Sequence, residues 1–174
     1  MRTAAALALL SLFLLTACGG AAPVTPLLLA SHSASHVEVE IFLAWQEDGT
    51  AWLEATFTPE AGCHLYSKDL PPGGVDGLGR PTLLELVPGS ALESAGELSA
   101  SIPAQADEDN PALLVYPEGA VSLRQPVHLP PGEGWIEAQV AITYMACRSG
   151  TCFAPAVGEL ITVRIPRAGE VLSP

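Results

Sequence analysis

The sequence predicts an all-β fold, an antiparallel β-sandwich, and three features support that prediction. Several short segments alternate between apolar and polar residues, as strands with one buried face do. Gly and Pro, with 16 of each among 174 residues, gather between those segments and mark turns. No segment has a convincing helical period. With 15% charged and 49% hydrophobic residues, the composition also excludes a disordered chain and a coiled coil.

Each predicted strand rests on its own pattern. In residues 36–45 (HVEVEIFLAW), Val37, Val39 and Ile41 share one face, whereas intervening glutamates take the other. Pro126 interrupts a later segment and predicts an edge strand there, because proline cannot donate a ladder hydrogen bond. In chain order, the expected strands are residues 36–45, 50–58, 82–87, 121–129, 135–144 and 159–165.

These strands make up one predicted domain, residues 36–168, followed by a short tail, residues 169–174. Turn signals such as Pro130-Pro131-Gly132 separate the strands, and no internal repeat is visible. Several short strands with Gly and Pro turns are typical of a sandwich. The glycine-rich residues 73–79 lack the strand and helix that flank a dinucleotide-binding loop, so we interpret them as a surface loop.

The pattern of residues 1–17 indicates an export signal rather than a part of the fold. Residues 1–17 combine Arg2 with an apolar stretch too short to span a bilayer. Leu15-Thr16-Ala17-Cys18 resembles a bacterial lipobox, which predicts lipidation of Cys18. Residues 18–35 are small, contain proline and carry little charge, so we expect a tether between lipid and domain. A lipid anchor holds a protein on a membrane without spanning it. The expected location is therefore the periplasm or the cell exterior.

The net charge of the chain indicates which classes of partner to expect. The formal net charge is −12, and the seven basic residues are scattered, which argues against a nucleic-acid partner. An acidic surface of this kind keeps a protein soluble and favours a monomer.

The cysteines carry the most chemical information. If Cys18 is lipidated, Cys63, Cys147 and Cys152 remain, and export permits disulfides. Cys147 and Cys152 are close enough to bridge if Ser149-Gly150 turns the chain. A disulfide that closes such a small loop adds little stability, so it would be a weak structural bond, or staple. A pair at a loop tip is accessible to other thiols and is therefore well placed for thiol exchange. The residues alone leave three interpretations open: redox exchange, a structural staple, or a metal site completed by further ligands such as His64.

Two segments resemble a known family. Residues 141–155 (AITYMACRSGTCFAP) are similar to the active-site stretch in the N-terminal periplasmic domain of the thiol:disulfide interchange protein DsbD. Residues 62–71 (GCHLYSKDLP), with the glycine pair at 73–74 and residues 79–82 (GRPT), are similar to an earlier stretch of that domain. The two segments occur in the family's order, and together the resemblance covers most of residues 36–166.

The resemblance implies an immunoglobulin-like sandwich and a pair of redox-active cysteines. Cys152 would form the mixed disulfide with a partner, and Cys147 would then resolve it. Tyr66 and Tyr144 would pack around the pair, and His64 would lie beside it.

The family also has a loop that caps its cysteines. The matching stretch here is residues 110–119, with Leu114, Val115 or Tyr116 as the capping side chain. Cys63 stands where many relatives have tryptophan.

The implied function is relay of electrons from a membrane thiol transporter or a thioredoxin-like donor to oxidised exported proteins. No cofactor is implied. The family's full-length protein also has a membrane domain and a thioredoxin domain, and these residues contain neither, so we expect a separate donor. The alternative is a non-catalytic sandwich lipoprotein that binds a ligand, copper or a partner, with Cys147–Cys152 as a structural disulfide.

Overall fold

The computed structural model describes residues 25–45, 50–108 and 110–171. Nearly all of its regular structure is strand, and every named strand pairing is antiparallel. The strands are β1 Leu27–Ala34, β2 Val37–Trp45, β3 Ala51–Pro59, β4 His64–Leu65, β5 Leu83–Leu86, β6 Glu93–Ser94, β7 Ser99–Ala100, β8 Gln105–Ala106, β9 Leu114–Val115, β10 Val121–His128, β11 Trp135–Tyr144, β12 Ala146–Arg148, β13 Thr151–Cys152 and β14 Ala156–Pro166. The only helix among the described residues is the short α1, Ala168–Val171.

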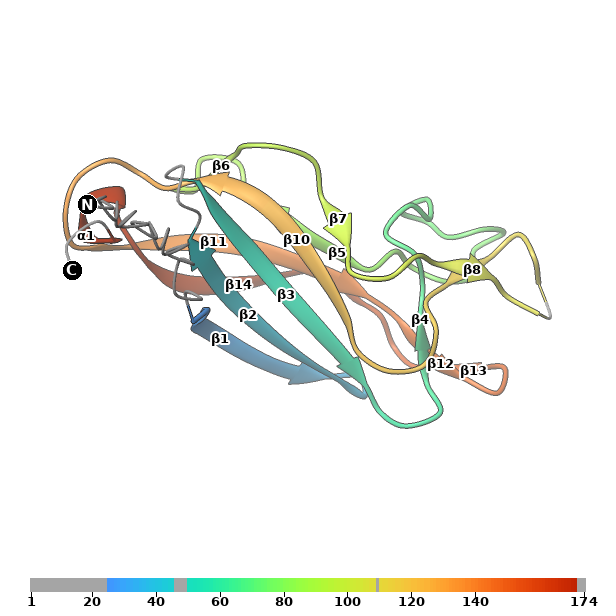
Figure 1. The fold of residues 1–174 in the computed structure, drawn as a ribbon. Coiled ribbons are helices and arrows are strands. Elements are labelled where there is room, and N and C mark those ends of the chain that lie inside the picture. Colours follow the sequence, from blue (N-terminus) through green and yellow to red (C-terminus); the bar gives the residue numbers. More distant parts are fainter. Residues whose placement is uncertain (1–24, 46–49, 109, 172–174) are drawn as a thin grey trace, which may run out of the picture.

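Two sheets pack face to face as an immunoglobulin-like sandwich (Figure 1). One has the order β1-β2-β3-β10-β6, with β7 also paired to β10, and the other has the order β14-β11-β5. The alternation predicted from sequence explains the core, since every second residue of β3, and of β2 from Val37 to Leu43, is buried. Opposite them lie buried residues of β11 and β14, such as Ile142 and Ile165. The all-β prediction is confirmed.

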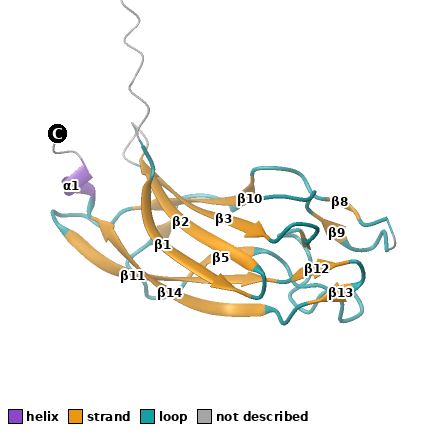
Figure 2. Cartoon of the chain, turned by 90° about the horizontal axis from the view of Figure 1, so that it is seen from below, coloured by secondary structure: helices purple, strands orange, loops and turns teal. Residues whose placement is uncertain are grey.

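A smaller assembly extends from one end of the sandwich. It contains the three-stranded sheet β13-β12-β4 and the β8-β9 pair. Figure 2 shows β8, β9, β12 and β13 together at the end opposite α1, and β4 is labelled beside β12 in Figure 1. Because β12 follows directly on β11, this end is a continuation of a sandwich strand and is held by it.

The structure corrects the predicted tether. Residues 27–34, placed in the tether by their composition, form β1 and pair with β2 from Leu27 opposite Leu43 to Ala34 opposite Val37. Ser35 and His36 make the connecting turn with φ of 50° and 64°, a conformation that closes tight hairpins. Pairing with β2 supplies hydrogen bonds that composition does not reveal.

Pro126 is also placed differently from the prediction. β10 lies between β3 and the short strands β6 and β7, so it is not an edge strand. Those short strands pair with residues on either side of Pro126. The Gln125 amide donates to Ser94 Oγ at 2.9 Å and to the Gly96 carbonyl at 2.7 Å. A side chain thus bridges the part of the ladder where proline offers no donor.

The remaining predicted strands form with small shifts at their ends. No helix in the described part of the chain is long and apolar enough to cross a membrane. The predicted signal, residues 1–17, and Cys18 lie outside the described residues.

Candidate functional site

Cys147 and Cys152 face each other across a two-strand hairpin. β12 and β13 pair with Cys147 directly opposite Cys152, and Ser149 and Gly150 form the turn with φ of 48° and 76°. The two cysteines form a disulfide with their Cα atoms 4.0 Å apart. The sequence placed this pair in a loop, whereas the structure shows that it joins paired strands. The predicted disulfide is confirmed.

The two sulfur-bearing residues differ in exposure. Cys147 is 2% exposed, since it lies between β13 and β4 and belongs to a small buried cluster. Cys152 sits on the outer strand and is exposed. An incoming thiolate needs a direct path to the sulfur it attacks. The accessible end of this disulfide is therefore Cys152.

A small apolar cluster lies beneath the disulfide, separate from the sandwich core. Its members come from several segments and are, together with Cys147, Tyr66, Leu70, Leu113 and Val115. The cluster buries one sulfur-bearing residue among apolar groups, where an unpaired thiolate is costly. A donor beside that sulfur consequently matters more than it would in water.

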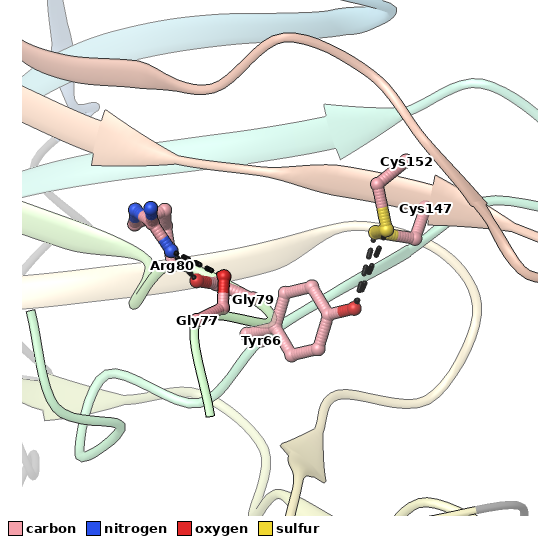
Figure 3. Close-up of a disulfide and its surroundings, with 6 residues drawn as sticks. All are labelled: Tyr66, Gly77, Gly79, Arg80, Cys147 and Cys152. Atoms are coloured by element: carbon pink, nitrogen blue, oxygen red, sulfur yellow. Dashed lines mark hydrogen bonds between the residues drawn. A yellow bond between two sulfur atoms is a disulfide. The ribbon is translucent and has the colours of Figure 1, made fainter. Parts of the chain in front are cut away.

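Tyr66 supplies such a donor. Its hydroxyl donates to Cys147 Sγ at 3.1 Å and lies 3.7 Å from Cys152 Sγ, as Figure 3 shows. Burial raises the pKa of Tyr66, and the negative charge of Asp107 raises it further. The phenol therefore keeps its proton throughout the neutral range and stays available as a donor.

The main chain around Tyr66 is also held. Its carbonyl accepts from Thr82 Oγ1 at 2.7 Å and from the Thr82 amide at 3.3 Å. Tyr66 forms isolated bridges to Pro81 and Val115. These contacts join Tyr66 to residues 81–82 and to Val115. They fix the position of its main chain, from which the ring projects toward the disulfide.

The disulfide opens into a pocket of about 530 Å³. Both cysteines, Tyr66 and His64 line it, together with apolar side chains such as Leu78. Its walls also include the acidic residues Asp107, Glu108 and Glu118. The pocket combines an apolar floor with acidic walls around an accessible sulfur.

His64 lies at the site as expected. It pairs with Cys147 across β4 and β12, and its ring meets Tyr66 edge to face at 5.4 Å between centroids. It thus contributes to the wall of the pocket and to the packing of Tyr66.

Tyr144 is placed elsewhere, which corrects the expectation that it surrounds the pair. It is completely buried in the sandwich core. Its ring is 5.8 Å from that of Phe57, and its hydroxyl donates to the Ala34 carbonyl at 3.1 Å. Although Tyr144 is near Cys147 in sequence, the chain passes from the core to the disulfide end between them.

The segment proposed as a cap is divided by strand alternation. Val115 lines the disulfide pocket with Leu113, whereas Leu114 and Tyr116 line a different pocket. The Tyr116 hydroxyl accepts from the Lys68 amide at 3.1 Å. Of the three capping candidates, Val115 is the one that lines the disulfide pocket. Tyr116 instead ties the segment to the main chain of Lys68.

Cys63 is a free, buried thiol of the sandwich core.

Arg148, the one basic residue between the bonded cysteines, points away from them. Its guanidinium donates to the Ala61 carbonyl at 3.4 Å and lies 5.9 Å from the Phe153 ring centroid. Neighbouring strand residues face opposite sides, which explains why Arg148 does not line the pocket of Cys147.

A metal was one of the interpretations that the sequence left open. Across the described residues, no three or more His, Cys, Asp or Glu side chains gather as a metal-binding group. A cysteine binds a metal as its thiolate, and in the disulfide neither Cys147 nor Cys152 is a thiolate.

Comparison with known proteins found similarity in structure only. No protein-family model matches the chain, and no curated protein matches it in sequence. It is similar to the N-terminal domain of DsbD from Neisseria meningitidis in its reduced form, with 20% identity and a TM-score of 0.43, over 78% of this chain and 86% of that one. It is also similar to the GAE domain of GGA2p from Saccharomyces cerevisiae, with 12% identity and a TM-score of 0.41, over 82% of this chain and 98% of that one.

Proposed function

We propose that this chain is a thiol–disulfide exchange domain that carries electrons through Cys147 and Cys152. The observation that carries the proposal is the asymmetry of the disulfide: Cys152 is exposed, and Cys147 is 2% exposed with a phenol hydroxyl 3.1 Å from its sulfur. A staple needs neither an accessible sulfur nor a donor on the other one. The sequence resemblance of residues 62–71, 73–74, 79–82 and 141–155 to the DsbD family supports the same function.

Reduction of the domain begins at the exposed sulfur. A donor thiolate attacks Cys152 Sγ, the Cys147–Cys152 bond breaks, and Cys147 Sγ leaves with the electron pair as a thiolate. The Tyr66 hydroxyl stabilises that charge by donating to it. A second donor thiol then attacks the donor sulfur of the mixed disulfide and releases Cys152. The donor ends oxidised and the domain reduced by two electrons.

Delivery of electrons runs the same chemistry in reverse. The Cys152 thiolate attacks an oxidised protein and displaces one of its thiolates. Cys147 then attacks Cys152 Sγ, which restores the intramolecular disulfide and releases the second thiol of the substrate. Because the two cysteines are opposite each other in the hairpin, the resolving sulfur is already within reach.

The partners and the location belong to the same proposal. The donor is a membrane thiol transporter or a thioredoxin-like protein, and the acceptors are oxidised exported proteins. Lipidation of Cys18 anchors the domain to a membrane on the periplasmic or external side. Exchange there needs no cofactor.

The test is the thiol state of the purified protein across a glutathione redox series, read by mass after alkylation. We expect Cys147 and Cys152 to interconvert together at roughly −180 to −270 mV, the range of thioredoxin-like partners. A matched Cys152→Ser variant should remain folded and lose all exchange. A pair that stays oxidised throughout the series overturns the proposal, since structural disulfides have potentials below about −300 mV.

A further inference from the structure

The glycine-rich segment before Arg80 is a closed, ordered turn. Val75 and Leu78 exchange two backbone hydrogen bonds, each of 2.9 Å, and Asp76 and Gly77 between them have φ of 51° and 82°. Two positive φ values in succession define the tight hairpin turn that Asp-Gly favours. With Arg80, the turn comprises residues 73–80 and contains the surface loop predicted for residues 73–79, whose tip, residues 76–78, is exposed.

The Arg80 side chain donates hydrogen bonds to three main-chain carbonyl groups of the turn. Its Nη1 donates to the Gly73 carbonyl at 3.0 Å and to the Gly77 carbonyl at 3.2 Å, and also to the Gly79 carbonyl. Figure 3 shows the bonds to Gly77 and Gly79, with the Tyr66 ring between this turn and the disulfide. One nitrogen of the guanidinium thus joins the entry, the tip and the exit of the turn. Its two N–H groups serve three carbonyl oxygens, so one N–H is shared between two of them.

The exit of the turn rests on the Tyr66 ring. Gly79 is buried with φ of 74°, and a Cβ atom there would lie 3.0 Å from Tyr66 Cδ1 and Cε1 and from Leu70 Cδ2. Contacts this short require the neighbouring side chains to shift when a side chain is added. The bare Gly79 backbone therefore forms one wall of the space that the Tyr66 ring occupies.

We propose that the turn of residues 73–80, held by Arg80, positions the Tyr66 hydroxyl against Cys147 Sγ and so sets how readily Cys147 leaves as a thiolate. Arg80 and Gly79 are positioning residues here, because they act through Tyr66 and touch neither sulfur. The inference rests on the proposed exchange function for its biological role. The placement of Tyr66 is testable independently of that function.

Two glycines of the turn provide a matched pair of variants. Gly79→Ala and Gly77→Ala both add a methyl group at positive φ, so both carry similar backbone strain. The Gly79 methyl group meets Tyr66 and its cluster neighbour Leu70, whereas the Gly77 methyl group has nothing within 4 Å. The pair separates displacement of Tyr66 from general disturbance of the turn.

The first readout is the rate at which glutathione opens the disulfide in the full chain, measured at fixed pH and corrected for the folded fraction. Tyr66→Phe should slow this step about tenfold, since a hydrogen bond to a charged group is lost. Gly79→Ala and Arg80→Ala should slow it severalfold, and Gly77→Ala should remain within about twofold of the parent. Adding Arg80→Ala to Tyr66→Phe should slow the step no further.

The second readout is the pH dependence of alkylation of Cys147 in the reduced protein carrying Cys152→Ser. Loss of the Tyr66 donor should raise the apparent pKa of the Cys147 thiol, and Gly79→Ala should raise it more than Gly77→Ala. Equal shifts for the two glycine variants, or additive effects of Arg80→Ala and Tyr66→Phe, overturn the positioning role. If glutathione fails to open the parent disulfide while these thiol shifts occur, the proposed function fails and the positioning role stands.

Discussion

A buried tyrosine lies in each of two regions of the molecule, and the two tyrosines make different contacts. The sandwich body consists of the sheets β1-β2-β3-β10-β6 and β14-β11-β5, and the disulfide end consists of β13-β12-β4 and β8-β9. Tyr144 in the body donates to the Ala34 carbonyl and packs on Phe57, so its hydroxyl joins β11 to the end of β1. Tyr66 in the disulfide end donates to Cys147 Sγ, the sulfur that leaves as a thiolate in the proposed exchange. We therefore propose that the same side chain contributes stability in one region and reactivity in the other.

The largest expected effect on stability is in the sandwich body. Phe57→Ala removes a fully buried ring and should lower the free energy of unfolding by about 3–5 kcal/mol, measured by urea denaturation. The exchange rate of the molecules that remain folded should not change, because Phe57 lies outside the disulfide pocket. A parallel loss of exchange per folded molecule would show that the two regions are coupled.

Opening the disulfide should cost less. The bond closes a loop with a sequence separation of 5, for which chain entropy predicts about 2 kcal/mol. Unfolding of the parent protein with and without a reducing agent measures this difference. Cys152→Ser is the matched control and should resemble the reduced parent. If reduction unfolds the protein at room temperature, the disulfide is a structural bond and the contrast between the regions is wrong.

Removing one hydroxyl from each region gives the sharpest test of the comparison. Tyr144→Phe should lower stability by about 1 kcal/mol, the worth of one hydrogen bond, and leave exchange with glutathione unchanged. Tyr66→Phe should show the opposite pattern, with slower exchange and little loss of stability. Equal effects of both variants on both measurements would contradict a division of roles.

The smallest effect is the response to alkaline pH. Burial is the main cause that raises the pKa of Tyr66, Tyr116 and Tyr144, so the folded state binds the phenol protons more tightly than the unfolded state does. Stability from this source should be constant below about pH 9 and fall as the pH rises past about 10, the pKa of unfolded tyrosine. Tyrosinate absorbance, followed together with unfolding, measures it. Ionisation of these residues near pH 10 with no loss of stability would argue against their burial.

The sequence predicted the sandwich strands because their periodicity is local. Residues 135–144 alternate along their whole length, and the structure pairs them on both sides as β11. β1 was missed because residues 27–34 look like a tether in composition and become a strand through pairing with β2. Pro126 suggested an edge, but the Gln125 side chain replaces the missing ladder contact, and such a replacement leaves no sequence pattern.

The disulfide site was predicted in part. The spacing of Cys147 and Cys152 and the turn at Ser149-Gly150 are local features, so the pair was visible in the sequence. Tyr144 was assigned to the site because it is near in sequence, whereas its side chain packs in the core. Asp76-Gly77 is a recognisable signal for a tight turn, yet nothing local shows that this turn contacts Tyr66.

By itself, the sequence determined the sandwich strands other than β1, the positions of the turns between them and the close spacing of Cys147 and Cys152, since each depends on residues within a few positions of one another. The tertiary structure alone decided which sulfur is exposed, which tyrosine reaches it and what holds that tyrosine in place. Those features join segments as distant as Tyr66 and Cys147, and contacts of that range depend on how the strands pack rather than on any local pattern.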